Sequence, residues 1–239
     1  MHAIRWLALA VLLAANAPAQ DLVQVSPAIA KVEYEDATIR VVRSHYEPGA
    51  SSAMHKHPAR VVISLIPASF RLSRPDGSSI TPPPDPQLRP LAFGAESHAV
   101  TNIGNTPAEN IEIEFKGLAE FGALRTAPLE SSADPDSLLH EPHHHWLMES
   151  PWFRVVEARI PPGDATQWHR HSHSNVSVRI GGSEVSTQAR DGEWSKPASA
   201  AAGSIEFRNV EAPYEHRVRN NGSGEYRVVL IELLRRDEH

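Results

Sequence analysis

The chain has 239 residues, a formal net charge of −6 and no cysteine. Without cysteine there can be no disulfide or thiolate chemistry, so histidine is the main soft metal ligand available. The acidic balance argues against nucleic acid or an anionic membrane as a partner. The length is sufficient for two domains that each bury a core.

The N-terminus has the pattern of a signal peptide over residues 1–19. Arg5 supplies a positive charge, an apolar run extends from Trp6 to Ala15, and Ala17-Pro18-Ala19 is a small-x-small cleavage site. A bilayer needs about 20 apolar residues, so this run is too short to span one. We expect Sec-type export, a periplasmic or secreted protein, and no membrane contact after signal cleavage. The alternative is a buried N-terminal strand or helix.

The rest of the chain has the pattern of an all-β protein. Residues 61–66 are rich in β-branched side chains, residues 111–115 alternate apolar and acidic, and residues 226–234 form a largely apolar run. Gly and Pro punctuate these segments as in sandwiches and barrels. The five prolines of 81–90 predict a stiff surface loop. Residues 117–139 are interpreted as a linker with short helical turns at 118–124 and 137–140.

One sequence pattern occurs twice at an offset of 114 residues. Gly49 is followed by five residues and His55-Lys56-His57, and Gly163 by five residues and His169-Arg170-His171. A further histidine and asparagine follow in each copy at an offset of 118, His98 with Asn102 and His216 with Asn220. The sequence therefore predicts a tandem duplication, with one unit over 20–116, a linker over 117–139 and a second unit over 140–239.

The spacing of the histidines predicts two metal sites. Residues i and i+2 of a strand point to one face, so both imidazoles of a His-x-His can reach one ion. A third histidine from a neighbouring strand would complete a three-nitrogen site.

These two motif halves, Gly-x5-His-x-His and a distal His-x-x-x-Asn, resemble those of the cupin superfamily, and two copies are similar to a bicupin. The resemblance implies two antiparallel jelly-roll β-barrels, the double-stranded β-helix. It implies a turn at Gly49 and at Gly163. It also implies that the barrels pack together or that chains form a homodimer. The metal ligands that it implies are His55, His57 and His98, and His169, His171 and His216.

The chain departs from many cupins by lacking a glutamate four or five residues after the second histidine. Those positions are Val61 and Val62 in the first copy, and Asn175 and Val176 in the second. Three neutral imidazoles leave the +2 charge of a metal uncompensated, which favours anionic ligands and leaves coordination positions open. The metal would be a divalent transition ion (Fe, Mn, Zn or Cu).

Two classes of function remain open. The first is a dioxygenase-like oxidoreductase acting on a small anionic or enolisable molecule, or a metal-dependent isomerase or hydrolase using the same site. The second is a non-enzymatic periplasmic protein that binds a metal or small molecule or serves as a scaffold. No catalytic residue is assigned by spacing; Glu96 and Glu215 are the nearest carboxylates to the distal histidines.

The second copy has the more polar surroundings and is the expected principal site. Its substrate-contacting or metal-supporting residues are expected to be Gln167, His173 and Asn175. The run at 143–145 is three histidines, and its alignment with residues 29–31 favours an exposed strand face or an interface over a metal patch.

Overall fold

The computed structural model describes residues 20–128 and 136–235. The expected signal peptide, residues 1–19, lies outside this range. Within it, no helix has the length and apolar character needed to cross a membrane. The described part is nearly all β, with one short helix, α1 (Leu22–Val25), and one 3-10 turn, η1 (Leu138–His140).

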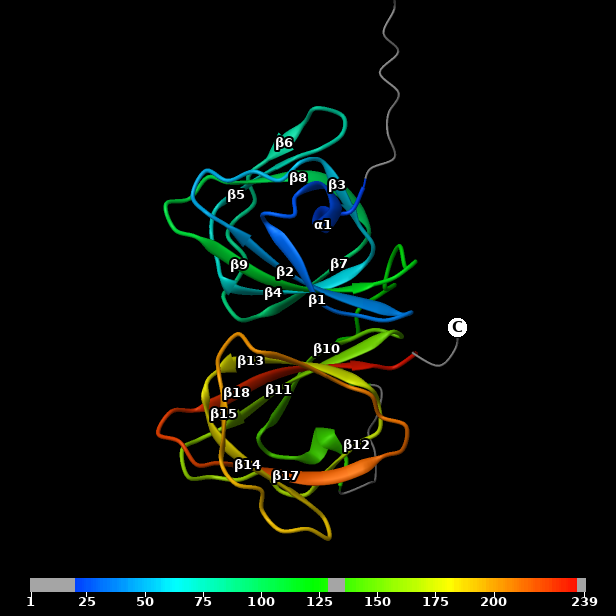
Figure 1. Ribbon diagram of the computed structural model, residues 1–239. Coiled ribbons are helices and arrows are strands. Elements are labelled where there is room, and N and C mark those ends of the chain that lie inside the picture. The colour runs from blue at the N-terminus through cyan, green and yellow to red at the C-terminus, as the bar shows by residue number, and fades with distance from the viewer. Residues whose placement is uncertain (1–19, 129–135, 236–239) are drawn as a thin grey trace, which may run out of the picture.

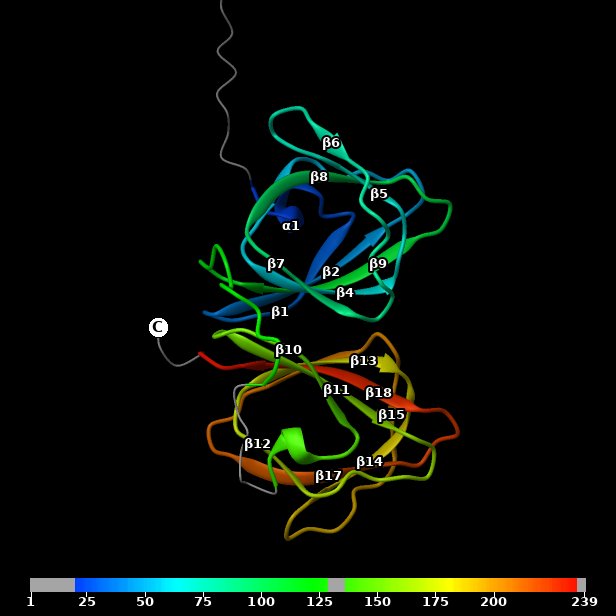
Figure 2. The same cartoon turned by 180° about the vertical axis from the view of Figure 1, so that it is seen from behind.

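The N-terminal barrel consists of two facing antiparallel sheets. The five-stranded sheet has the order β1-β2-β9-β4-β7, and the four-stranded sheet the order β3-β8-β5-β6. Figure 2 shows the smaller sheet on the side of this barrel away from the second barrel. The strands are β1 (Ala30–Glu35), β2 (Ile39–Tyr46), β3 (His55–His57), β4 (Arg60–Ile66), β5 (Phe70–Ser73), β6 (Ser79–Ile80), β7 (Pro90–Phe93), β8 (Glu96–Asn102) and β9 (Ala108–Phe115).

The C-terminal barrel repeats this architecture. Its sheets have the orders β10-β11-β18-β13-β16 and β12-β17-β14-β15, which match the first barrel strand for strand from β1 to β9. The strands are β10 (His144–Glu149), β11 (Phe153–Ile160), β12 (His169–His171), β13 (Asn175–Gly181), β14 (Ser183–Ala189), β15 (Ala198–Ala200), β16 (Ile205–Arg208), β17 (Tyr214–Asn220) and β18 (Tyr226–Leu233). The predicted all-β fold of two jelly-roll barrels is confirmed.

The main hydrophobic core lies between the barrels, where their five-stranded sheets face each other (Figure 1). Ile111 and Ile113 of β9 and Val229 and Ile231 of β18 belong to it, each 0% exposed. Because strand side chains alternate between faces, the other face of each sheet is left for the barrel interior. Burial of apolar surface thus joins the barrels, while the interiors can carry polar groups.

The segment between the barrels is more ordered than a simple linker. Phe121 belongs to the inter-barrel core and packs edge-to-face on Phe153, with ring centroids 4.7 Å apart. The expected helical turn at 118–124 is absent from the described structure, because Phe121 is drawn into this apolar contact as irregular chain. The turn expected at 137–140 is present as η1.

Candidate metal centres

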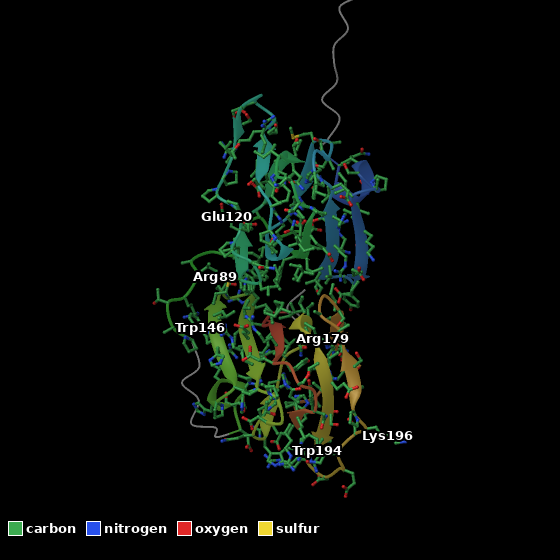
Figure 3. The ribbon with its side chains drawn as sticks, turned by 90° about the vertical axis from the view of Figure 1, so that its left-hand side faces the viewer. Arg89, Glu120, Trp146, Arg179, Trp194 and Lys196 are labelled. Atoms are coloured by element: carbon green, nitrogen blue, oxygen red, sulfur yellow. The ribbon has the colours of Figure 1, made fainter. Side chains whose placement is uncertain are left out.

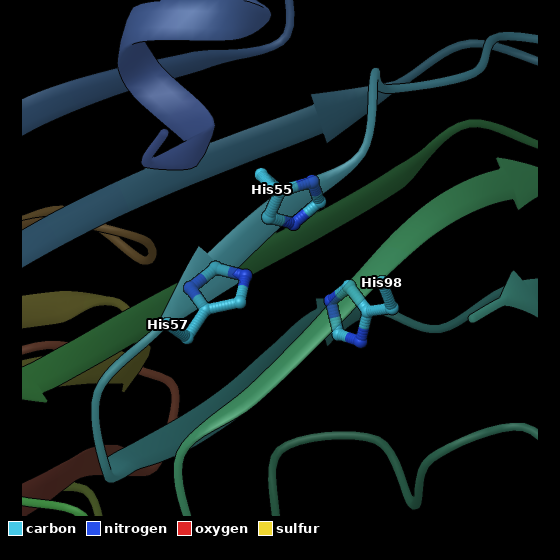
Figure 4. Close-up of side chains that lie close together, drawn as sticks. All are labelled: His55, His57 and His98. Atoms are coloured by element: carbon cyan, nitrogen blue, oxygen red, sulfur yellow. The ribbon is translucent and has the colours of Figure 1, made fainter. Parts of the chain in front are cut away.

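Paired strands bring three histidines together in each barrel. His55 lies directly opposite His98 in the β3–β8 pair, and His169 lies opposite His216 in the β12–β17 pair. The second histidine of each His-x-His points to the same face. In both barrels one ring nitrogen of each histidine lies within 4.8 Å of those of the other two. Figure 4 shows the three rings of the first barrel directed toward a common point.

The turns that lead into these strands are held by the second half of the motif. Gly49 and Gly163 have positive φ angles of 80° and 79°, a conformation that favours glycine. Their backbone N–H groups donate to the carbonyls of Asn102 and Asn220 at 2.9 and 3.0 Å. The spacing from the distal histidine to the asparagine therefore fixes the entry of the His-x-His strand.

The histidines of the first barrel are oriented as metal ligands. His55 Nδ1 donates to the Ala53 carbonyl at 2.8 Å, and His57 Nδ1 donates to Glu114 Oε1 at 2.7 Å. A ligating histidine commonly binds such an acceptor with the nitrogen that does not contact the metal. The opposite nitrogen of His55, Nε2, is buried and has no hydrogen-bond partner in the described residues. A divalent ion would satisfy it, so these residues fit a metal.

The histidines of the second barrel have a comparable arrangement. His169 Nδ1 donates to the Gln167 carbonyl at 3.0 Å. The Nε2 atoms of His171 and His216 lie 3.0 Å apart, so the nitrogen that carries a proton donates to the other one. With the proton on the other ring nitrogen, both Nε2 atoms could bind a shared ion.

Burial favours the neutral, metal-binding form of the His55, His171 and His216 imidazoles. Desolvation lowers the pKa of His55 to about 4 and that of His216 to about 3, with neighbouring histidines contributing to both shifts. The pKa of His171 is also well below its ordinary value for the same reason. At neutral pH these three histidines therefore need not lose a proton before an ion binds.

The triad of the first barrel lines a cavity of about 290 Å³, called here the first cavity. Its charged lining residues are Arg60, Asp85, Glu96 and Glu112. Arg60 connects two of the carboxylates, with Nη2 at 2.7 Å from Glu96 and Nε at 3.1 Å from Glu112. Phe70, Leu72 and Phe93 supply part of its apolar wall.

Sequence reasoning missed Glu112 and Glu114. Both lie in the alternating segment 111–115, whose isoleucines pack against the second barrel. The acidic side chains consequently face inward, and Glu112 and Glu114 are 7% and 1% exposed. The strict alternation of 111–115 shows that the isoleucines and the glutamates lie on opposite faces of the strand. The usual expectation that charged side chains face solvent would place the glutamates on the outside, which is the reverse of what the structure shows.

The triad of the second barrel lines a smaller cavity of about 130 Å³, called here the second cavity. Asn175 also lines it. Gln167 and His173 are not among the lining residues. The side chain of Gln167 is exposed and its carbonyl contacts His169. His173 lies at a bend after β12 has ended at His171, so the strand alternation that placed it beside the ligands does not apply.

The strand register corrects one pairing between the copies. The offset of 114 pairs Asn175 with Val61, but Asn175 lies opposite Glu232 while Arg60 lies opposite Glu114. Asn175 is therefore the counterpart of Arg60. The shift arises because one more residue separates His171 from Asn175 than separates His57 from Arg60.

Two other expectations about polar residues change. Glu96 lines the first cavity with its pKa lowered to about 2 by His98 and Arg60, whereas Glu215 pairs with Arg170 outside the second cavity. His144 does not lie on an exposed face: its ring packs on His169 with centroids 4.6 Å apart and lines the second cavity. The offset of 114 aligns His144 with Ala30, a small apolar residue that is itself buried at 4% exposure in the structure.

Comparison with known proteins identifies the fold. No protein-family model and no curated protein matches the chain. Among solved structures, AerE from Microcystis aeruginosa has a TM-score of 0.55 at 16% identity, over 86% of this chain and 97% of that one. A cupin 2 conserved barrel domain protein from Leptotrichia buccalis has a TM-score of 0.51 at 12% identity, over 86% and 88%. A variant of salicylate 1,2-dioxygenase from Pseudoaminobacter salicylatoxidans has 0.54 at 11%, over 87% and 78%.

These likenesses are in fold. The chain has the jelly-roll architecture of cupin-fold proteins, present as two tandem barrels, and each barrel contains a group of three histidines able to hold a metal ion.

Proposed function

We propose that the protein is a metal-dependent, dioxygenase-like oxidoreductase that acts on a small anionic or enolisable molecule at its three-histidine sites. The observation that carries this proposal is the convergence of three imidazoles beside a cavity in each barrel. The fold likeness to a salicylate 1,2-dioxygenase supports the reaction class.

The ligands proposed are His55, His57 and His98 in the first barrel and His169, His171 and His216 in the second. A divalent transition metal held there would supply Lewis acidity and a means of activating dioxygen, with coordination positions open to substrate. Iron or manganese would suit chemistry with dioxygen, whereas the usual order of divalent-metal affinities for nitrogen ligands favours copper or zinc.

The chain's own groups would position the reactants. Glu114 orients the His57 ring through its 2.7 Å hydrogen bond, and the Ala53 and Gln167 carbonyls orient His55 and His169. The apolar walls of both cavities would exclude water from the bound substrate. Asn175, which is 2% exposed and lines the second cavity, can contact a substrate beside His171.

A non-enzymatic metal-binding or small-molecule-binding role is the alternative, and one observation favours it for the first barrel. The carboxylates of Asp85, Glu96 and Glu112 around the first cavity would compensate the charge of an ion without an anionic substrate. A metal-dependent isomerase or hydrolase could use the same sites. Both roles are compatible with export to the periplasm or beyond, which we propose from residues 1–19.

Oxygen uptake tests the proposal. Protein loaded with Fe(II), Mn(II), Zn(II) or Cu(II) would be supplied with small carboxylates, β-diketones and thiols in an oxygen electrode. We expect uptake with at least one substrate, and its loss in a variant that lacks both triads. Tight metal binding without uptake for any substrate would favour the binding role, and protein that takes up no metal would refute both.

A further inference from the structure

The two cavities differ in the charge that surrounds their histidines. Around the first cavity, Arg60 is neutralised by Glu96 and Glu112, and Asp85 adds a third carboxylate. In the second barrel Leu230 takes the position of Glu112. Glu112 lies opposite Val62, two residues after Arg60, and Leu230 lies opposite Ser177, two residues after Asn175. The second cavity therefore lacks the carboxylate that faces the first triad.

Each barrel has an arginine next to its triad at the β4–β7 or β13–β16 strand pair, but on different strands of that pair. Arg179, labelled in Figure 3, is a second arginine that lines the second cavity. In the first barrel Arg60 of β4 lies opposite Phe93 of β7. In the second barrel Asn175 of β13 lies opposite Arg208 of β16. Arg60 and Asn175 are counterparts, and so are Phe93 and Arg208. The arginine thus lies on β4, next to the edge, in the first barrel and on the edge strand β16 in the second barrel.

Arg208 lies at the mouth of the second cavity. It lines this cavity together with the three histidines, and its side chain is 47% exposed. Its guanidinium lies 5.0 Å from the centroid of the Tyr214 ring, which stacks on His171 at 5.0 Å. Stacking on an aromatic ring fixes the plane of an arginine while leaving its N–H edge free for an acceptor.

The charge of Arg208 is only partly compensated. Glu206 pairs with Arg208 at 3.2 Å and with Arg179 at 2.6 Å, so one carboxylate serves two guanidinium groups. All three line the second cavity and leave it one positive charge in excess.

We propose that Arg208 binds the carboxylate group of a small carboxylate substrate at the mouth of the second cavity, next to the metal held by His169, His171 and His216. This inference rests on the proposed function for the metal and adds the class of substrate and the residue that selects it. Arg208 is a substrate-binding residue in this scheme and takes no part in proton transfer.

The size and shape of the site determine the class. The second cavity measures about 130 Å³, whereas pockets for drug-sized ligands measure about 300–1,000 Å³. A carboxylate matches the planar donor edge of a guanidinium through two parallel hydrogen bonds. The remaining atoms of a small acid would extend past Tyr214 toward the histidines.

Anion titration of a metal-substituted protein tests this role without turnover. In a His55→Ala/His57→Ala background only the second triad would take up Co(II), whose visible absorption bands report on anions that bind next to the ion. Acetate and inorganic phosphate would be the probes. The variants are Arg208→Gln, Arg208→Lys and the control Arg159→Gln. Arg159 is also 47% exposed and is paired with a carboxylate, Glu157, but it does not line the cavity.

We expect Arg208→Gln to weaken acetate binding by about 10-fold or more, the usual effect of losing a charged hydrogen bond. Arg208→Lys should restore part of the affinity, and Arg159→Gln should leave it unchanged. Equal weakening by Arg208→Gln and Arg159→Gln, or no weakening by either, would overturn the proposal. Phosphate binding more tightly than acetate would overturn the carboxylate class.

Two further measurements separate this inference from the proposed function. If the double histidine background does not fold, the wild-type protein loaded at both sites serves, and Arg208→Gln should remove one of two acetate-binding phases. Arg208-dependent acetate binding without oxygen uptake for any substrate would refute the oxidoreductase alone. Oxygen uptake whose KM is the same in Arg208→Gln would refute the inference alone.

Discussion

Glu114 forms hydrogen bonds to His57 of the first triad and to Arg40, one with each oxygen of its carboxylate. One oxygen accepts from His57 Nδ1 at 2.7 Å, and the other accepts from Arg40 at 2.7 Å. The second barrel retains the arginine–glutamate pair, Arg154 and Glu232 at 3.2 Å. However, His171 Nδ1 has no hydrogen-bond partner among the described residues. The two triads are therefore supported differently although their ligands match.

This difference predicts unequal metal affinity. Glu114→Gln replaces the charged acceptor by a neutral amide, which makes the His57 ring less basic and less firmly oriented. We expect the affinity of the first site for Zn(II) to fall by about 10–100-fold. Competition with a chromophoric chelator, in a His169→Ala/His171→Ala background, measures this affinity.

The repeat supplies the matched control for this experiment. Glu232→Gln, in a His55→Ala/His57→Ala background, removes the same charge from the corresponding position. It should change the affinity of the second site by less than Glu114→Gln changes the first. The reverse order would show that Glu114 does not support His57 as a ligand.

Metal content should follow the two triads separately. The native protein should carry up to two divalent ions per chain, one for each histidine group. His55→Ala with His57→Ala should remove one, and His169→Ala with His171→Ala the other, as measured by elemental analysis after dialysis. His57 has a carboxylate hydrogen-bond partner and His171 Nδ1 has none among the described residues, so the first site should retain its ion under mild chelation. That ion should be absent from His55→Ala/His57→Ala. Loss of both ions from either variant would show that the sites are coupled.

The fold was predictable because the duplicated motif carries turn chemistry as well as ligands. Proline–glycine, His-x-His and the distal asparagine repeat at nearly constant offsets, and each has a role in the backbone: Gly49 adopts a positive φ and donates to the Asn102 carbonyl. Packing of the two barrels was one of the two arrangements that the resemblance implied, but the residues of the inter-barrel core were not predicted, because alternation within 111–115 defines two faces but does not say which one meets another domain.

The residues around each triad could be predicted only in part, because the pairing of distant strands decides which side chains lie next to the histidines. Asn175 was singled out because it stands near the position of the missing glutamate, and it lines the second cavity. Strand alternation singled out His173, which lies where the chain bends after His171 and is not among the lining residues. Arg208 was not identified because its place beside the triad depends on its pairing with Asn175, 33 residues away in the chain. The contacts that distinguish the two cavities are thus cross-strand neighbours, which local spacing does not reveal.

The distal asparagines should stabilise the fold without affecting metal chemistry. Asn102 Nδ2 donates to the carbonyls of Tyr46 and Thr106 at 2.9 and 2.8 Å, and its Oδ1 accepts from the Gly104 N–H at 2.9 Å. Asn102→Ala would leave these groups without partners at a site that is 0% exposed, at a cost of about 3 kcal/mol in the free energy of unfolding. Urea denaturation of the metal-free protein measures this cost. A loss below about 1 kcal/mol would mean that water replaces the side chain.

The metal-free protein should lose stability on mild acidification. The folded-state pKa of His55 is about 4, below the value of about 6.5 expected in the unfolded chain, so the unfolded state binds more protons between these values. The stabilisation is fully present above about pH 6.5 and is lost as the pH falls toward 4. For His55 alone the loss is on the order of 3 kcal/mol, and His216 acts in the same direction.

Urea denaturation of the metal-free protein at a series of pH values between 4 and 7 measures this dependence. His55→Gln should reduce the slope, because the substituted side chain does not titrate. Saturation with Zn(II) should raise the stability at pH 7 and make its fall on acidification steeper, since bound metal competes with protons. Stability that stays constant from pH 7 to pH 5 would show that the buried imidazoles do not titrate as the structure requires.

The inter-barrel core should make the two barrels unfold together. Phe153 is 0% exposed and packs between Phe121 of the connecting segment and Phe115 of the first barrel, with ring centroids 4.7 and 5.7 Å away. Phe153→Ala leaves a cavity there, which costs about 3–5 kcal/mol, while Phe153→Leu should cost less because it fills more of the space. Circular dichroism during urea denaturation should show one transition for the native protein and an earlier one for Phe153→Ala. If the native protein showed two well-separated transitions, the barrels would be folding independently, and the shared core would contribute little to their stability.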